Sequence, residues 1–192
     1  MQQSRKIIIN TFLLLMALGL VFVWQLFSSY SDSSTVKKSN YLIKFNLSSL
    51  EPGEVRFLHK NGLPIVVMRR TKQDLKQLIE LRSHLSDPDS KHSQQPGYAK
   101  NYYRSLKPEF FIAYAVIPVT GSSIHYRLDS FQTLYNKEGN WFGGFSGTTA
   151  EQLFDKAGRS YFSTVNNLQV PNYKLNSQNQ LYVYTLKSLE FN

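Results

Sequence analysis

The sequence contains no cysteine and only four histidines among its 192 residues. The lack of cysteine excludes disulfide bonds, thiolate zinc sites, cysteine nucleophiles and every cysteine-ligated iron–sulfur or haem group. The histidines do not have the spacing of a metal-binding motif; they are His59, His84, His92 and His125. A chain of this length accommodates one domain and an additional segment, but not two domains of ordinary size.

One long hydrophobic run covers residues 7–27 and follows the basic pair Arg5-Lys6. As a helix with a rise of about 1.5 Å per residue it would span about 31 Å, close to the thickness of the hydrocarbon core of a membrane. A cleavable signal peptide is the alternative, but its apolar part is usually only about 7–15 residues long and precedes a small-x-small cleavage site. This run instead ends in Trp24 and Phe27, which are typical of a membrane interface. Residues 1–27 are therefore predicted to be a membrane anchor.

The basic pair also predicts the orientation of this anchor. Because Arg5 and Lys6 precede the apolar run, the positive-inside rule places the N-terminus in the cytoplasm. The rest of the chain is then expected outside the cytoplasm; in a bacterium with two membranes, this predicts a single-pass protein of the bacterial inner membrane with a periplasmic C-terminal domain. Residues 28–40 contain six serines and no apolar periodicity, which indicates a flexible tether. The folded domain is expected to cover residues 41–192.

The pattern of this domain is mainly β. Aromatic residues make up 14% of the chain, which suits a β-rich core. Alternating or continuous apolar runs predict strands at residues 41–47, 55–58, 64–68, 110–116, 125–128 and 181–186. Thr71 and Asp74 have the spacing of a capping box, and Leu75, Leu78 and Ile79 follow at helical spacing, so one short helix is expected there.

The net charge of +9 is concentrated in one segment. Between Arg56 and Lys107 there are 11 Lys or Arg and 4 Asp or Glu residues, a net charge of +7, whereas Pro108 to Asn192 holds 6 of each. No base-reading motif accompanies this charge, so nucleic acid is not an expected partner. Two interpretations stay open: a basic face directed at anionic lipid or an acidic subunit, or a solvated surface that promotes solubility.

Several motifs occur in an order that resembles one protein family. They are LSSLEPG at 47–53, NGLPIVV at 61–67, LSDPDSK at 85–91, RSLKPE at 104–109 and DKAGR at 155–159. This order resembles the Rieske iron–sulfur subunit of bacterial ubiquinol–cytochrome c reductase, the cytochrome bc1 complex, over nearly the whole chain. The resemblance implies a Rieske-like antiparallel β-sandwich or barrel with a small cluster-loop subdomain, a single N-terminal transmembrane helix, and cytochrome subunits and membrane lipid as partners.

The resemblance fails at the residues that would bind the cluster. Members of the family hold a [2Fe–2S] cluster through two loops, C-T-H-L-G-C and C-P-C-H-G-S-H. The leading Cys and first His of each loop ligate iron, and the remaining Cys residues form a disulfide. The matching loops here are residues 117–122 and 143–149. The ligand positions hold Ile117, Val119, Gly143 and Ser146, and the disulfide positions hold Ser122 and Phe145. Iron at such a site needs thiolate or imidazole donors, so no cluster, other cofactor or metal is expected.

Further changes surround these loops. The family's proline-rich shielding segment is matched by residues 163–166, which lack proline, and residues 150–153 are additional. Ile117, Val119 and Phe145 are expected to fold inward as an apolar plug, each contributing about 1.5–3 kcal/mol if buried. This would offset a lost disulfide, typically worth about 2–4 kcal/mol. His125 is not expected to replace a ligand, because a single imidazole without partners does not hold a metal.

An enzymatic function is not predicted. Residues 144–147 resemble a nucleophile elbow, but Thr148 stands where the pattern needs glycine, and no motif supplies a His and an Asp. No catalytic residue and no small-molecule substrate are therefore expected. The predicted function is a non-catalytic, cluster-free subunit that structurally supports a respiratory cytochrome complex, of the bc1 type or an associated terminal oxidase. The alternative is a periplasmic assembly factor or protein-binding module that uses the remodelled loop tip.

Overall fold

The computed structural model describes residues 15–17, 19–21, 23–25, 41–60, 62–128 and 141–184. The chain divides into two compact units, Met1–Ser39 and Asn40–Asn192. The described residues of the first unit are helical. In the part of the chain that is described, no helix is long and apolar enough to cross a membrane. The predicted tether, residues 28–40, and most of the predicted anchor lie outside the described residues. The second unit is called the head below.

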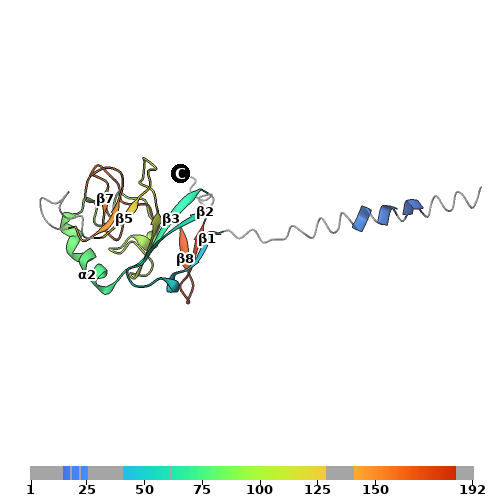
Figure 1. Cartoon of the computed structure of the whole chain (residues 1–192), viewed down its shortest axis with the longest axis horizontal. Helices are drawn as coiled ribbons and strands as arrows, with labels where there is room; N and C mark the ends of the chain where they lie inside the picture. Colours follow the sequence, from blue (N-terminus) through green and yellow to red (C-terminus); the bar gives the residue numbers. More distant parts are fainter. Residues whose placement is uncertain are drawn as a thin grey trace, which may run out of the picture. The chain divides into compact units, whose positions relative to one another are not determined.

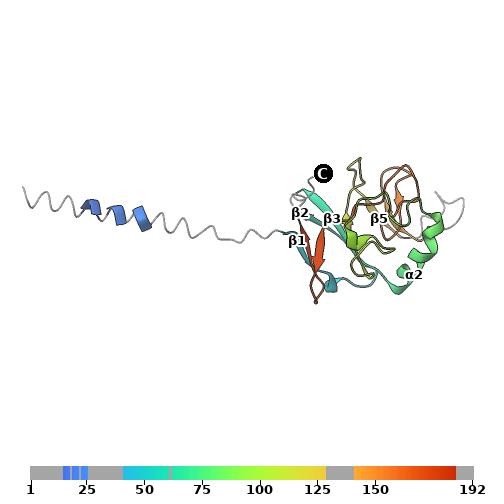
Figure 2. The same cartoon turned by 180° about the vertical axis from the view of Figure 1, so that it is seen from behind.

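The described part of the head contains three antiparallel sheets of three strands each (Figures 1 and 2). The first sheet has the order β1-β9-β8, with bounds Tyr41–Asn46, Gln180–Tyr184 and Tyr173–Leu175. The second has the order β2-β3-β4, with bounds Val55–Lys60, Leu63–Arg69 and Phe110–Tyr114. The third has the order β5-β6-β7, with bounds His125–Arg127, Gly144–Ser146 and Leu153–Phe154. The prediction of a mainly β, antiparallel head is confirmed.

Strand β3 is the centre of the second sheet and carries its longest buried run. Ile65, Val66, Val67 and Met68 are all fully buried, because β3 has a partner on both sides and both of its faces are covered. The β2–β3 turn brings Lys60 opposite Leu63, and Gly62 in this turn has a φ of 79°. A positive φ in a two-residue hairpin turn is the conformation that glycine adopts without strain.

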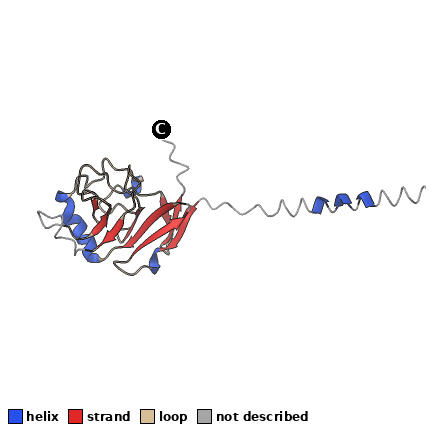
Figure 3. Ribbon diagram, turned by 45° about the horizontal axis from the view of Figure 1, so that its top comes forward, coloured by secondary structure: helices blue, strands red, loops and turns tan. Residues whose placement is uncertain are grey.

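Helix α2, Lys72–Glu80, begins at the predicted capping box. The Thr71 Oγ1 accepts a hydrogen bond from the Asp74 N–H at 3.1 Å, and the Asp74 carboxylate accepts one from the Thr71 N–H at 2.7 Å. Leu78 is buried, and the helix continues as a 3₁₀ turn over Leu81–His84. Two other 3₁₀ turns cover Leu47–Ser49 and Gly97–Ala99. Figure 3 shows α2, in blue, next to the group of shorter strands.

One continuous core joins the three sheets. Its buried apolar residues come from strands of all three sheets and from connecting segments, and include Leu42, Leu47, Ile65, Met68, Phe110, Phe111, Ile112, Phe145, Phe154, Leu168, Leu181 and Val183. The third sheet is therefore packed onto the rest of the head, because Phe145 and Phe154 belong to the same core as the second sheet.

Two arginines of the basic segment lie inside the head, which corrects the expectation that this charge lies at the surface. Arg70 donates to the carbonyls of Lys156, Pro108 and Tyr103 at 2.8–2.9 Å. Burial lowers the pKa of Arg70 to about 9 and that of Arg104 to about 10, so both side chains stay cationic at neutral pH.

Arg104 is completely buried and ties distant segments together. Its guanidinium donates to the carbonyls of Ala157, Gly158 and Leu168 at 2.6–3.1 Å. Planar guanidinium groups with several donors can satisfy several carbonyls at once, which explains how these cations are accommodated inside the protein. These two arginines hold the chain together and contribute nothing to a docking face.

Candidate functional site

The first of the two loops matched to the family's cluster loops connects β4 to β5. It is closed by main-chain hydrogen bonds from the Ile117 N–H to the Ser122 carbonyl at 2.8 Å and from the Gly121 N–H to the Ile117 carbonyl at 3.0 Å. The Ile117 side chain is 1% exposed and belongs to the core, whereas Ser122 is only half-buried. A position matched to an iron ligand is thus occupied by a core side chain.

The second matched loop contains β6, the central strand of the third sheet. Phe145 is fully buried, with ring centroids 5.7 Å from Phe111 and 5.6 Å from Tyr126. Aromatic rings at these separations pack favourably in tilted arrangements. A position matched to a disulfide cysteine is therefore filled by an aromatic side chain that joins β4, β5 and β6.

Gln152, from the additional residues 150–153, closes the second loop. Its side-chain carbonyl accepts hydrogen bonds from the N–H groups of Thr148 and Thr149, at 2.9 and 3.2 Å. A Cβ placed on Gly147 would overlap both the Gln152 carbonyl oxygen and the Ile117 Cδ1. The two loops are thus in direct contact at Gly147, and side chains fill the space above it.

Val119 does not join this packing, so the prediction of a three-residue plug is wrong for one residue. Its side chain is 96% exposed, and its backbone has a φ of 77°. The Val119 side chain is thus in solvent, whereas that of Ile117 is in the core. A β-branched residue in this backbone region is rare and strained. The plug consists of Ile117 and Phe145 alone.

The residues present do not fit an iron–sulfur cluster. Ile117 and Gly143 have no side-chain donor atom, and the Ser146 hydroxyl already accepts a hydrogen bond from the Arg127 Nε at 3.0 Å. His125 is exposed on β5, where it is paired in register with Ser146. In the described ranges, no three His, Asp or Glu side chains gather in a way that could hold a metal ion. No redox step can be derived from this donor set.

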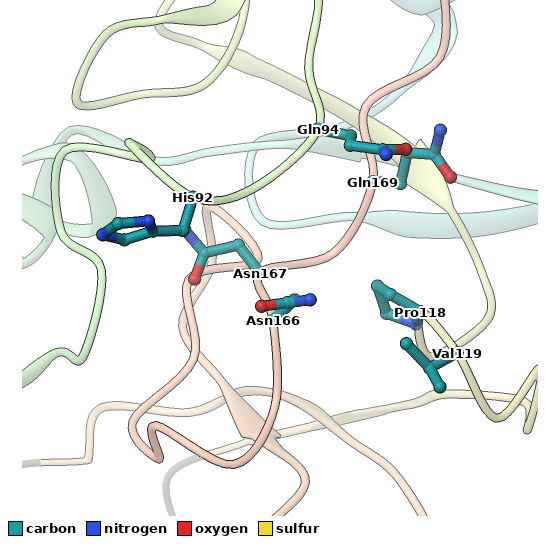
Figure 4. A pocket seen from close by; sticks show the side chains of 7 residues that line it. All are labelled: His92, Gln94, Pro118, Val119, Asn166, Asn167 and Gln169. Carbon is teal, nitrogen blue, oxygen red and sulfur yellow. The ribbon is translucent and has the colours of Figure 1, made fainter. Parts of the chain in front are cut away.

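A cavity of about 220 Å³ lies beside the first loop (Figure 4). It is lined by side chains from three separate segments, His92, Gln94, Pro118, Val119, Asn166, Asn167 and Gln169. Sequence reasoning missed this pocket, because no motif connects residues so far apart in the chain. The one sequence signal near the pocket is that residues 163–166 lack proline, whereas the matching segment of the family is rich in it.

Hydrogen bonds fix two of the three segments that line this pocket. The buried Asn167 accepts a bond from the Ser160 N–H at 2.7 Å and donates to the Asp87 carbonyl at 2.9 Å. The Asp87 carboxylate in turn accepts from the N–H groups of Lys91, His92 and Ser93 at 2.7–3.2 Å. The loop over residues 87–93 is therefore held against residue 167 on one side of the pocket.

Comparison with known proteins supports the resemblance read from the motifs. No family model matches the chain. A "ubiquinol-cytochrome c reductase iron-sulfur subunit" from Allochromatium vinosum is 31% identical over 134 residues, which are 70% of this chain and 64% of that protein. The chain thus spans a little under two thirds of the length of this curated relative. The predicted resemblance is confirmed: the chain is related to the iron–sulfur subunit of ubiquinol–cytochrome c reductase.

Proposed function

We propose that this protein is a cluster-free, Rieske-like subunit that structurally supports a respiratory cytochrome complex and does not itself transfer electrons. The observation that carries the proposal is the burial of Ile117 and Phe145 in the core, in the two loops that the resemblance matches to the cluster loops. The similarity to a subunit of ubiquinol–cytochrome c reductase supports association with a complex of that type.

The two loops matched to the cluster loops do not enclose an open cluster site, because side chains are packed between them. The Ile117 Cδ1 and the Gln152 side-chain oxygen fill the space over Gly147. Burial of the isoleucine side chain contributes about 1.5–3 kcal/mol. Side-chain packing holds the two loops together, and this supports the proposed structural role.

The proposed partners are cytochrome subunits and membrane lipid. Apart from the buried arginines, the basic segment has exposed lysines that can contact these partners; they include Lys72, Lys91 and Lys100. Exposed lysines of this kind suit contact with an acidic subunit or with anionic head groups. In this proposal residues 1–27 anchor the chain, with the head in the periplasm.

Co-purification tests the proposal. The tagged full chain is extracted from its native membranes in a mild detergent, and haem is measured by its absorbance after size-exclusion chromatography. We expect haem-containing subunits in a fixed ratio to the tagged chain. An unrelated single-pass protein with the same tag is the control. A haem-free monomer in the same detergent would contradict the proposal.

The second candidate is an assembly factor or binding module that acts through the first loop. The exposed Val119 and the pocket beside it favour this candidate, because both lie on the surface that the substitutions have changed. A transient partner would be lost during extraction but retained after chemical cross-linking in the membrane. Cross-linked products in a preparation that otherwise yields a haem-free monomer would favour this second function.

A further inference from the structure

We propose that the pocket beside the first loop binds a neutral sugar, as a ligand and not as a substrate. The site consists of the amide side chains of Gln94, Asn166 and Gln169 and the apolar side chains of Pro118 and Val119 (Figure 4). This inference is independent of the proposed function, because a sugar site can exist whether or not the chain is part of a cytochrome complex.

The amide side chains are available to a ligand. Within the described residues, the side chains of Gln94, Asn166 and Gln169 have no hydrogen-bond partner. Each primary amide offers two donors and one acceptor oxygen, so each can bind a hydroxyl group as donor or as acceptor. Three such groups around one cavity match a ligand with several hydroxyl groups.

The absence of charge in the lining selects a neutral ligand. None of the lining residues is Asp, Glu, Lys or Arg. His92 is the one titratable lining residue, and in Figure 4 its ring is turned away from Pro118 and Val119. An ionic ligand would lose its hydration without gaining a counter-charge, which is costly. A carboxylate or ammonium group on the sugar should therefore weaken binding.

The size of the cavity selects a single ring. Its volume of about 220 Å³ lies below the range of about 300–1,000 Å³ that is typical of sites for drug-sized ligands. A hexose ring also has an apolar face of C–H groups, which Pro118 and Val119 can cover. Few ligand atoms limit the affinity that such a site can reach, so we expect binding in the millimolar range.

The backbone strain and the exposure of Val119 together support a ligand at this surface. Its β-branched side chain is held at a φ of 77° and yet is 96% exposed, so neither backbone preference nor packing in the head explains it. Strained backbone of this kind is frequent at ligand-binding loops. Contact with the apolar face of a sugar would cover part of this exposed side chain.

Ligand-detected saturation-transfer NMR on the full chain tests the proposal. The chain is placed in phosphatidylcholine nanodiscs, because detergents with sugar head groups would compete. The probes are D-glucose and N-acetyl-D-glucosamine, with D-glucuronate and D-glucosamine as charged analogues. The variants are Asn166→Ala, Gln169→Ala and Val119→Gly. Gln178→Ala is the matched control, since Gln178 is an exposed amide outside the pocket.

We expect saturable binding of at least one neutral sugar. Loss of one amide should weaken it about 2- to 10-fold, the effect of one net hydrogen bond. Val119→Gly should weaken it as well, without lowering stability, and Gln178→Ala should leave it unchanged. The proposal is overturned if neither neutral sugar binds, if a charged analogue binds more tightly, or if the pocket variants bind as well as the unmodified chain.

Discussion

The side chain of Ile117 lies directly over Gly147, so the two loops matched to the family's cluster loops touch where one of them has no side chain. Gln152 completes this contact from the additional residues. An added methyl group at residue 147 would overlap the end of the Ile117 side chain and would lie 2.8 Å from the Gln152 Cβ. The contact between the two loops therefore requires glycine at residue 147, because there is no space for a larger side chain.

We expect Gly147→Ala to destabilise the head. Overpacking of a filled site typically lowers the free energy of unfolding by about 1–3 kcal/mol. The measurement is the urea midpoint of the full chain, followed by tryptophan fluorescence. Gly97→Ala is the matched control, because a Cβ at residue 97 meets nothing within 4 Å. Equal midpoints for the two variants would show that the two loops are not in tight contact.

The apolar plug predicts a large difference between two substitutions to alanine. Phe145→Ala removes a fully buried ring that packs on Phe111 and Tyr126, and should cost about 3–5 kcal/mol. Val119→Ala removes only exposed methyl groups and should not lower the free energy of unfolding. Thermal unfolding of both variants is the measurement. A Phe145→Ala variant as stable as the unmodified chain would refute the plug.

A third substitution should stabilise the protein. Val119→Gly relieves a β-branched residue from a φ of 77°, and the relief of strain, about 1–3 kcal/mol, exceeds the flexibility cost of glycine, about 0.5–1 kcal/mol. We expect a higher urea midpoint. The neighbouring Thr120→Gly change, at an exposed residue without positive φ, should instead lower it. If both changes lower the midpoint equally, the backbone at residue 119 is not strained.

The buried pair of Asp74 and Lys156 predicts a pH dependence of stability. Their side chains are joined at 2.6 Å. Burial alone would raise the pKa of Asp74, but hydrogen bonds from Lys156 and Thr71 outweigh it and hold the pKa below its usual value. The stabilisation from the pair is therefore complete above the unfolded-state pKa of about 3.9, and is lost as the pH falls through the lower folded-state pKa.

Asp74→Asn should consequently lower the free energy of unfolding by about 3 kcal/mol at neutral pH. The difference from the unmodified chain should shrink below about pH 4, and urea titrations at several pH values measure it. Glu80→Gln is the control, since Glu80 forms an exposed pair with Lys76 at 3.9 Å and should have little effect. A difference that stays constant down to pH 2 would contradict the assignment.

The donor set predicts the metal content of the isolated protein. We expect far less than one iron per chain and no electron paramagnetic resonance signal of a reduced [2Fe–2S] cluster, because thiolate and imidazole donors are missing from both loops. A cluster-bearing Rieske subunit, purified in parallel under anaerobic conditions, is the control. A stoichiometric cluster signal would overturn the central proposal.

The sequence predicts those features that depend on neighbouring residues. The capping box at Thr71 and the strands around residues 55–68 and 110–114 follow from local patterns, and the structure confirms them. Strands β6, β7 and β8 were not predicted, because runs of two or three residues are too short to establish a period.

Features that depend on distant residues could not be predicted. Arg70 and Arg104 look like surface cations in the sequence, because the carbonyls that accept their hydrogen bonds lie up to 86 residues away. The outward turn of Val119 depends on a backbone φ that valine seldom adopts. The pocket likewise exists only after three loops have come together.

The pairing of β1 with β9 determines when the head can be completed. Phe45 on β1 lies opposite Leu181 on β9, the first and last of the described strands, so most of the described head separates the two partners in the sequence. During synthesis β1 has no partner strand until β9 has been made. Such long-range pairing slows folding. Loss of the residues from Gln180 onward would remove the partner of both β1 and β8, and would loosen the head where its chain begins.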